Sequence, residues 1–279
     1  MGWTDYHLHT RDSADSTELM DRVCRRAIEL RLDEVCFTEH YDTDPYDIGY
    51  AYYDDARYER RLAEVCERYG DHLVIRKGLE FDFQSRYAGR VAEHLAEWRF
   101  DYLLGSVHCI FGVMAARAVT ERHFPPDEVY RVYFDEIRDL IATGLPNCLG
   151  HLDYVRKTLW RELQGYRYPD YERQMRDIVA RLVQAEIGLE VNTRYFGPGG
   201  QPMVPGLDVL TMYREAGGRI VTLGSDAHQA ECVAAGFPDA CDLLRRAGFT
   251  EMMTFKDRNP VSRPLPTGVE GVAGGALGF

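Results

Sequence analysis

The stretch Asp5-Tyr6-His7-Leu8-His9-Thr10, near the start of the chain, is typical of a strand that runs into a loop. Near the other end, Leu223-Gly224-Ser225-Asp226-Ala227-His228 has the same character. Because side chains alternate between the two faces of a strand, residues two apart point the same way. Each stretch therefore predicts two side chains that could bind a cation together, His7 with His9 and Asp226 with His228.

Further short apolar runs predict more strands, and stretches with helical spacing lie between them. The runs are 35–37, 73–75, 102–104, 148–149, 189–191 and 220–223. Alternation of strands and helices along the whole chain predicts parallel strands joined by right-handed crossovers. About seven strands favour a closed or nearly closed α/β barrel of the TIM type over an open sheet.

The helices are predicted from apolar stripes and from their end signals. Tyr58, Leu62, Val65 and Tyr69 form one stripe at helical spacing, and a second stripe runs through 175–183. Pro125-Pro126-Asp127 is typical of a helix start, and Gly144 of the end of that helix. These stripes are expected to be packing surfaces.

Composition excludes several classes of protein. The 279 residues carry a formal net charge of -12, which repels a phosphate backbone and argues against binding of long nucleic acid. A small phosphate ester is not excluded, because bound cations would dominate the local field. The N-terminus does not resemble a signal peptide, and no apolar stretch is long enough to cross a bilayer. We therefore expect no membrane partner, and the sequence does not predict the oligomeric state.

Cysteine usage and the C-terminal composition bear on compartment and domain organisation. Seven cysteines without a CxxC pair indicate reduced thiols in a cytoplasmic protein. No shift in composition marks an internal boundary. We predict one catalytic domain over 1–258 and a loosely held tail, rich in Pro and Gly, over 259–279.

Six of the nine histidines follow predicted strands. A single histidine in such a place is usually a structural residue, but successive strand ends all face one mouth of an α/β barrel. The polar residues predicted to converge there are His7, His9, His40, Glu80, His108, His151, Asp226 and His228. The other three histidines, His72, His94 and His123, are expected on the surface.

The residue types predict the kind of ion. Imidazole and carboxylate together suit zinc, iron or manganese rather than calcium. A tetrahedral zinc takes four ligands, so this many candidates indicate two or three ions. Glu80 could bridge two of them, because a carboxylate has two oxygens.

These motifs resemble the polymerase and histidinol phosphatase (PHP) superfamily, and within it the histidinol-phosphate phosphatases. The order is HxH at His7 and His9, Thr38-Glu39-His40, a strand-end Glu80, a single His108, Gly150-His151 and a final DxH at Asp226 and His228. Asp12-Ser13-Ala14-Asp15-Ser16 and Leu189-Glu190-Val191-Asn192-Thr193 are also similar to that branch. The resemblance implies a distorted (β/α)7 barrel, the PHP fold, with a multinuclear metal site.

The resemblance also implies how the ligands are shared. His7, His9, Glu80 and Asp226 would bind one ion, Glu80, His108 and His151 a second, and Asp15, His40 and His228 a third. Asp15 enters only through the resemblance, because its residue type and position equally suit the N-cap of a helix that begins near Thr17.

The implied activity is hydrolysis of L-histidinol phosphate in histidine biosynthesis. A hydroxide bridging two ions would attack phosphorus, while the third ion offsets phosphate charge. Asp226 or His228 could relay protons. Arg194 and Arg156 are candidate phosphate anchors, because the guanidinium fork can make two hydrogen bonds to phosphate, although solvated surface arginines are more common.

Two other functions are compatible with parts of these motifs. A PHP phosphodiesterase or nuclease acting on nucleotides or short oligonucleotides remains open, since acidity opposes only long polynucleotides. A non-catalytic module that stabilises a polymerase is disfavoured, because the ligand set is complete. The aromatic run Tyr46, Tyr50, Tyr52 and Tyr53 could line a pocket for an imidazole ring, but we favour a packed loop.

Overall fold

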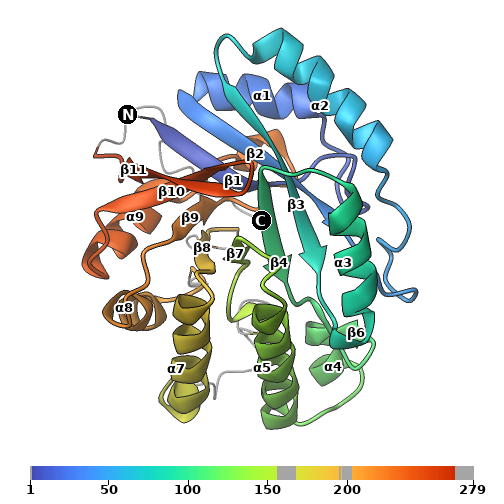
Figure 1. The fold of residues 1–279 in the computed structure, drawn as a ribbon, viewed down its shortest axis with the longest axis vertical. Coiled ribbons are helices and arrows are strands. Elements are labelled where there is room, and N and C mark those ends of the chain that lie inside the picture. The colour runs from blue at the N-terminus through green and yellow to red at the C-terminus, as the bar shows by residue number, and fades with distance from the viewer. Residues whose placement is uncertain (1, 156–167, 195, 197–202, 268–279) are drawn as a thin grey trace.

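The computed structural model describes residues 2–155, 168–194, 196 and 203–267. Its centre is a seven-stranded sheet in which every pair of neighbouring strands is parallel (Figure 1). Across the sheet the strands are β1 (Trp3–Leu8), β2 (Leu32–Tyr41), β3 (Val74–Asp82), β4 (Tyr102–Ser106), β7 (Cys148–Leu149), β8 (Gly188–Asn192) and β9 (Val221–Gly224). All seven coincide with strands predicted from the sequence.

The two edges of this sheet meet, so the barrel is nearly closed. Leu8, the last residue of β1, forms a parallel bridge with Ala227, which lies just beyond β9, and the His9 amide donates a hydrogen bond of 2.9 Å to the Ala227 carbonyl. Closure leaves the edge strands without a long row of unpaired backbone groups. The predicted barrel of seven strands is confirmed.

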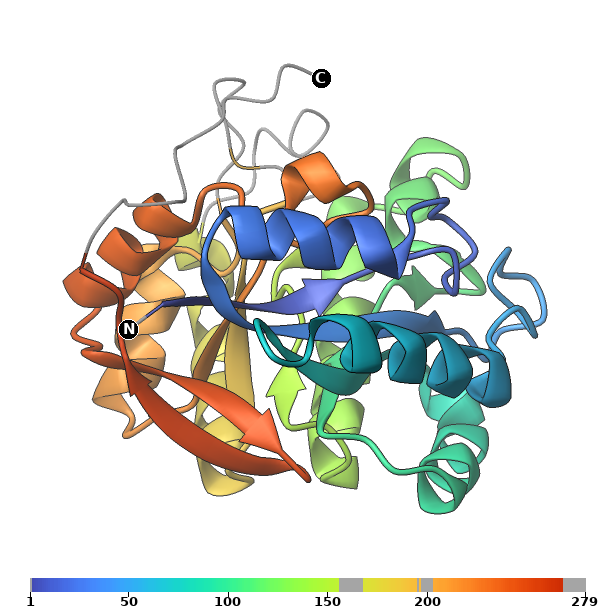
Figure 2. The ribbon, with the colours of Figure 1, turned by 90° about the horizontal axis from the view of Figure 1, so that it is seen from above.

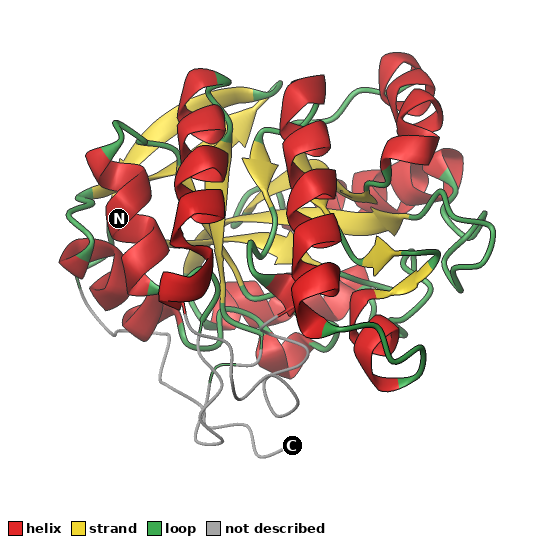
Figure 3. Ribbon diagram, turned by 90° about the horizontal axis from the view of Figure 1, so that it is seen from below, coloured by secondary structure: helices red, strands yellow, loops and turns green. Residues whose placement is uncertain are grey.

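Helices form an outer layer around the strands (Figure 3). They are α1 (Met20–Glu29), α2 (Asp55–Tyr69), α3 (Ala88–Glu97), α4 (Ala115–Thr120), α5 (Pro126–Thr143), α7 (Tyr168–Gln184), α8 (Leu207–Glu215) and α9 (Phe237–Arg246). The predicted stripe on α2 buries Tyr58, Leu62 and Val65. The α5 helix ends as predicted, at Gly144 with φ 64°, a conformation that favours glycine. No described helix has the length and apolarity needed to span a membrane.

The sheet has two buried faces, and the inner one contains a small apolar cluster. Alternate residues such as Leu103 pack toward the helices, whereas Tyr6, Cys36, Tyr102, Leu104, Cys148 and Phe255 pack together inside. Strand β1 departs from strict alternation, because its register with β2 shifts between Asp5 and Leu8. Tyr6 and His7 therefore both face the barrel interior, where Tyr6 packs in the inner cluster and His7 contacts Glu80. Such irregularities re-aim side chains next to functional sites.

A hairpin lies beside β9 and near the start of β1 (Figure 2). It consists of β10 (Glu251–Lys256) and β11 (Asn259–Pro264), paired antiparallel over their whole length. Phe255 belongs to the inner cluster, and Arg263 Nη2 donates to Glu34 at 2.7 Å. The expectation of a loosely held segment is thus wrong for 259–264, because backbone pairing and this partly buried ion pair fix them. The boundary at residue 258 stays a prediction, and 268–279 lie outside the described residues.

Four short elements complete the described fold. Strands β5 (Cys109–Ile110) and β6 (Val113–Met114) pair antiparallel, and single 3₁₀ turns lie at Ser85–Tyr87 and Ala230–Cys232.

Of the three histidines expected on the surface, His72 and His123 are exposed. His94 is not, because its ring stacks on Tyr41 with centroids 3.9 Å apart and its side chain is 12% exposed.

Candidate metal centre

The nine predicted ligands lie together at the carboxyl ends of the barrel strands. His40 lies near the end of β2, Glu80 lies near the end of β3, and His7 lies in β1. The others follow a strand directly or lie in the loop after β1, namely His9, Asp15, His108, His151, Asp226 and His228. Side chains separated by more than 200 positions meet here, because parallel strands bring their carboxyl ends to one side.

The first cluster unites the two ends of the chain. His7, His9 and Asp226 have donor atoms within 4.8 Å of one another. The two histidine Nε2 atoms are 2.9 Å apart, and each lies 3.6–3.7 Å from Asp226 Oδ1. Glu80 Oε2 approaches the same two nitrogens, at 3.1 Å from His7 and 3.3 Å from His9.

The second cluster uses the other oxygen of Glu80. Glu80 Oε1 lies 2.9 Å from His151 Nε2 and 3.4 Å from His108 Nε2, and the two nitrogens are 3.1 Å apart. Ser106 Oγ donates to the same oxygen at 2.6 Å. Glu80 is 1% exposed and separates the two clusters, which is the arrangement a bridging carboxylate requires.

The third cluster lies nearer the surface. Asp15 Oδ2 lies 2.8 Å from His228 Nε2 and 3.5 Å from His40 Nε2, and His9, His40 and His228 also share a compact set of donor atoms. Asp15 is 36% exposed and makes these contacts in place of the helix cap that its sequence position suggested. The α1 helix begins at Met20, and the residue before it makes no side-chain cap.

One further grouping was not predicted. Asp42 has a carboxylate oxygen within 4.8 Å of donor atoms of His40 and His108. Burial, opposed by the nearby imidazoles of His40 and His108, raises the pKa of Asp42 to about 6. Asp42 lies one residue beyond β2. A carboxylate at the end of a predicted strand is the sequence signal by which it could have been identified.

The spacing of the donor atoms fits divalent cations. Ligands of an ion bound at about 2.0–2.1 Å are roughly 3–3.5 Å from one another. The nitrogen pairs at 2.9 and 3.1 Å and the oxygen contacts at 2.9–3.4 Å lie in this range or 0.1 Å below it. The donor set of imidazole and carboxylate suits zinc, iron or manganese. The residues present therefore fit the metals that the sequence predicts.

The surrounding charges and burial keep two central residues, His9 and Glu80, in the protonation state that binds a metal. Burial, reinforced by His40 and His228, holds the pKa of His9 well below its usual value, so this imidazole stays neutral and keeps a lone pair. Burial opposes ionisation of Glu80, but His7, His108 and His40 outweigh it and lower the pKa of Glu80 well below its usual value. A neutral imidazole and an ionised carboxylate are the species that bind metals.

Two other histidines, His7 and His40, are doubly protonated and positively charged when no metal is bound. Burial opposes a charge on His40, but Glu80 and Asp15 outweigh it and raise the pKa of His40 to about 10. Burial likewise opposes a charge on His7, and Glu190 and Glu80 raise its pKa well above the usual value. These protons balance the carboxylate charge, and metal binding would release them.

A buried network behind the clusters holds the ligands in place. Ser13 Oγ lies 3.1 Å from His9 Nδ1, accepts from the His40 amide at 2.9 Å and donates to Glu39 at 2.6 Å. On the other side, Glu190 accepts from the His151 amide at 2.7 Å and contacts His7 Nδ1. Sequence reasoning did not single out these supporting residues, although a buried Glu within the apolar strand β8 was a visible signal.

The clusters open into a cavity of about 700 Å³. Glu80, His108, His151, Asp226 and Arg194 line its inner part, and Tyr46 and Ile48 lie on its rim, 86% and 81% exposed. For Tyr46 the expectation of a packed loop is therefore wrong. It holds for Tyr53, which packs against Tyr41, Tyr58 and His94.

The structure places one of the two predicted arginines at the clusters. Arg194 Nη1 donates to Asp226 Oδ1 at 2.8 Å and lies 3.1 Å from His228 Nε2. Arg194 also lines the cavity. Arg156 lies outside the described residues.

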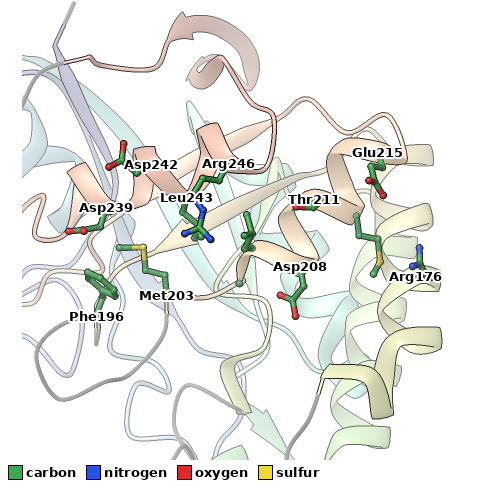
Figure 4. Close-up of a pocket in the computed structure, with 13 residues that line it drawn as sticks. Arg176, Phe196, Met203, Asp208, Thr211, Glu215, Asp239, Asp242, Leu243 and Arg246 are labelled. Carbon is green, nitrogen blue, oxygen red and sulfur yellow. The ribbon is translucent and has the colours of Figure 1, made fainter.

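A second hollow is larger but contains none of the predicted ligands. It measures about 1020 Å³ and is bordered by α8 and α9, with Met203, Leu243 and Arg246 among the side chains on its wall (Figure 4). Volume alone does not identify an active site, whereas convergent ionisable groups do. The smaller cavity is therefore the candidate site.

Comparisons with known proteins agree with this geometry. The family model of the PHP domain matches residues 5–194. The histidinol-phosphatase of Lactococcus lactis subsp. lactis (strain IL1403) is 30% identical over 90% of this chain and 93% of that protein. A probable histidinol-phosphatase of Thermotoga maritima is 28% identical over 88% of this chain and 92% of its own length.

Solved structures include a close counterpart of the fold. The crystal structure of histidinol phosphate phosphatase from Lactococcus lactis, complexed with zinc, L-histidinol and phosphate, matches with a TM-score of 0.81 at 26% identity, over 93% of this chain and 99% of that one. The putative histidinol phosphatase of Listeria monocytogenes matches in fold, with a TM-score of 0.75 at 21% identity over 85% of this chain and all of that one.

Proposed function

Because the chain belongs to the PHP domain family, we propose that it is a metal-dependent phosphomonoesterase that hydrolyses L-histidinol phosphate to L-histidinol and phosphate in histidine biosynthesis. One observation carries the proposal. The two oxygens of the buried Glu80 face two separate sets of histidine nitrogens, next to a cavity that opens to the surface. The relative with bound zinc, L-histidinol and phosphate supports the substrate.

We propose the assignment of metal ligands that the family resemblance implies. His7, His9, Glu80 and Asp226 would hold one ion, Glu80, His108 and His151 a second, and Asp15, His40 and His228 a third. When bound, two or three divalent ions supply Lewis acidity, which makes water a nucleophile near neutral pH and offsets the charge of the phosphate. Zinc, iron and manganese all suit these donors.

The remaining steps fall to side chains of this chain. Arg194 is proposed to bind non-bridging oxygens of the phosphate and to fix its orientation, because its guanidinium lies at the cavity wall beside Asp226 and His228. Asp226 or His228 is proposed to relay a proton during the reaction, although the role of each as a metal ligand restricts this. Arg156 remains a proposed second anchor from the sequence alone.

We also propose that the enzyme works in the cytoplasm. All seven cysteines are free, and five of them are buried. Unpaired thiols in this number are typical of proteins that stay in a reducing compartment.

Initial rates on three substrates test the function. We expect kcat/KM for L-histidinol phosphate to exceed that for a generic aryl phosphate, and hydrolysis of a bis-aryl phosphodiester to be slower than both. The comparison is made with one enzyme preparation of known metal content. A faster rate on the diester would overturn the proposal in favour of a PHP phosphodiesterase, the alternative that the sequence left open.

Replacing Arg194 by Ala is expected to lower kcat/KM for histidinol phosphate by about 10–150-fold, because hydrogen bonds to a charged group contribute about 1.5–3 kcal/mol. Steady-state kinetics measures the effect. Arg60→Ala, at an exposed position on α2, is the matched control and should behave as the unmodified protein. An unchanged kcat/KM in Arg194→Ala, with full metal content, would remove Arg194 from the site.

A further inference from the structure

Glu190 is a buried carboxylate whose two oxygens contact ligands of two different clusters. It lies in β8, is 1% exposed, and sits behind the metal centre. Its Oε1 contacts His7 Nδ1, on the side of the ring away from the first cluster. Its Oε2 accepts a hydrogen bond of 2.7 Å from the backbone amide of His151, which belongs to the second cluster.

The surroundings of Glu190 support this link. Asn192 Nδ2 lies 3.3 Å from each oxygen of Glu190 and donates to Asp226 Oδ2 at 3.2 Å, which extends the network to a third ligand. Room for the carboxylate depends on Gly224 in the neighbouring strand. A Cβ at position 224 would lie 2.1 Å from Glu190 Oε1 and 2.6 Å from the Cβ of His7.

The backbone of His151 gives the amide contact its importance. His151 has φ 22°, a backbone conformation that residues other than glycine rarely adopt. Such a conformation persists where neighbouring groups fix it. The bond from the His151 amide to Glu190 is one of the contacts that fix it, and it thereby sets the direction in which the ring leaves the chain.

The geometry points to Glu190 as a positioning residue that holds the first and second clusters at a fixed separation. It accepts the Nδ1 proton of His7, which leaves Nε2 with the lone pair that faces the cluster. It also anchors the backbone of His151 at the other cluster. This inference rests on the proposed metal roles of His7 and His151, and it adds a residue that does not itself touch an ion.

Glu190→Gln tests the inference with little change in shape. A glutamine side chain offers one acceptor oxygen and one donor NH2, so it can satisfy His7 or the His151 amide but not both. We expect zinc to bind about 10–100-fold more weakly, the range typical for loss of a carboxylate behind a metal-bound histidine. Competition with a chromophoric chelator measures the affinity, and elemental analysis gives the number of ions retained.

Two backgrounds separate the clusters. His9→Asn weakens the first cluster, and His108→Asn weakens the second. In each background we expect Glu190→Gln to reduce zinc affinity further, because the remaining cluster also depends on Glu190. The matched control is Glu186→Gln, which removes the same charge at an exposed position two residues before β8 and should leave zinc affinity unchanged.

The outcomes are distinct. Wild-type zinc affinity in Glu190→Gln, or a loss confined to one background, overturns the inference. Glu190→Asp, which keeps two acceptor oxygens but has a shorter reach, should show the same loss. Failure of both variants to fold in excess zinc also overturns it, because a positioning role leaves the hydrogen bonds of β8 intact. Absence of histidinol phosphate hydrolysis in the unmodified protein would defeat the proposed function without affecting these zinc affinities.

Discussion

Glu80→Gln is expected to lower kcat for histidinol phosphate by about 10³-fold or more. Glu80 presents Oε2 to His7, His9 and His40, and Oε1 to His108 and His151. Glutamine keeps the shape of the side chain but replaces one oxygen by an NH2 group, which cannot bind a cation. Two ions thereby lose a shared ligand. Loss of several kcal/mol of stabilisation by metals corresponds to this factor, since about 1.4 kcal/mol is tenfold in rate.

Single-turnover and steady-state rates of phosphate release measure this effect, together with elemental analysis of the same sample. Glu186→Gln again serves as the control for a change of charge alone. Circular dichroism should show an unchanged fold, because the carbonyl of the new side chain can still accept the bond from Ser106. A kcat within tenfold of the unmodified enzyme would contradict the assignment of Glu80 as a shared ligand.

Removal of the metals is expected to abolish activity and to lower the melting temperature by roughly 10–30 °C. An ion present at 100 times its dissociation constant adds about 2.7 kcal/mol to the free energy of unfolding. For a chain of this size each kcal/mol shifts Tm by about 2–4 °C. Two or three ions together give the expected range. The stabilisation arises because the ions bind the folded protein and not the unfolded chain.

Dialysis against a chelator, followed by elemental analysis, activity measurement and a thermal scan, checks this expectation. Zinc, manganese or iron(II) added back should restore both activity and Tm. Magnesium and calcium are the matched controls and should restore neither fully, because they prefer oxygen ligands over imidazole. Full activity in a preparation shown to be free of metal would refute a metal-dependent reaction.

The barrel and the convergence of its ligands could be predicted from local patterns. Strand alternation follows from covalent geometry, so His7 with His9 and Asp226 with His228 were placed correctly at strand ends. The number of strands and the parallel order then required one common mouth. Asp15 was different, because its own sequence favoured a helix cap, and only the family resemblance pointed to the ion cluster.

Other features depended on contacts that no local pattern contains. The register shift in β1, which turns Tyr6 and His7 to the same side, arises from pairing with β2. The strand at 259–264 is ordered by β10 and by Glu34, partners that its Pro-rich composition does not reveal. Tyr46 lines the cavity and is 86% exposed, a position that the aromatic run itself does not indicate.

The sequence by itself therefore determined the barrel of seven strands and, except for Asp15, the ligands that meet at its mouth, because the alternation of side chains along a strand and of strands with helices is visible in local patterns. Only the tertiary structure decided which donor atoms lie together. His9 approaches both Asp226 and His40, and Asp226 and His228 belong to different clusters although they are two residues apart. The physical reason is that ring orientation depends on buried partners such as Glu190, which comes from β8 and reaches His7 only once the barrel closes.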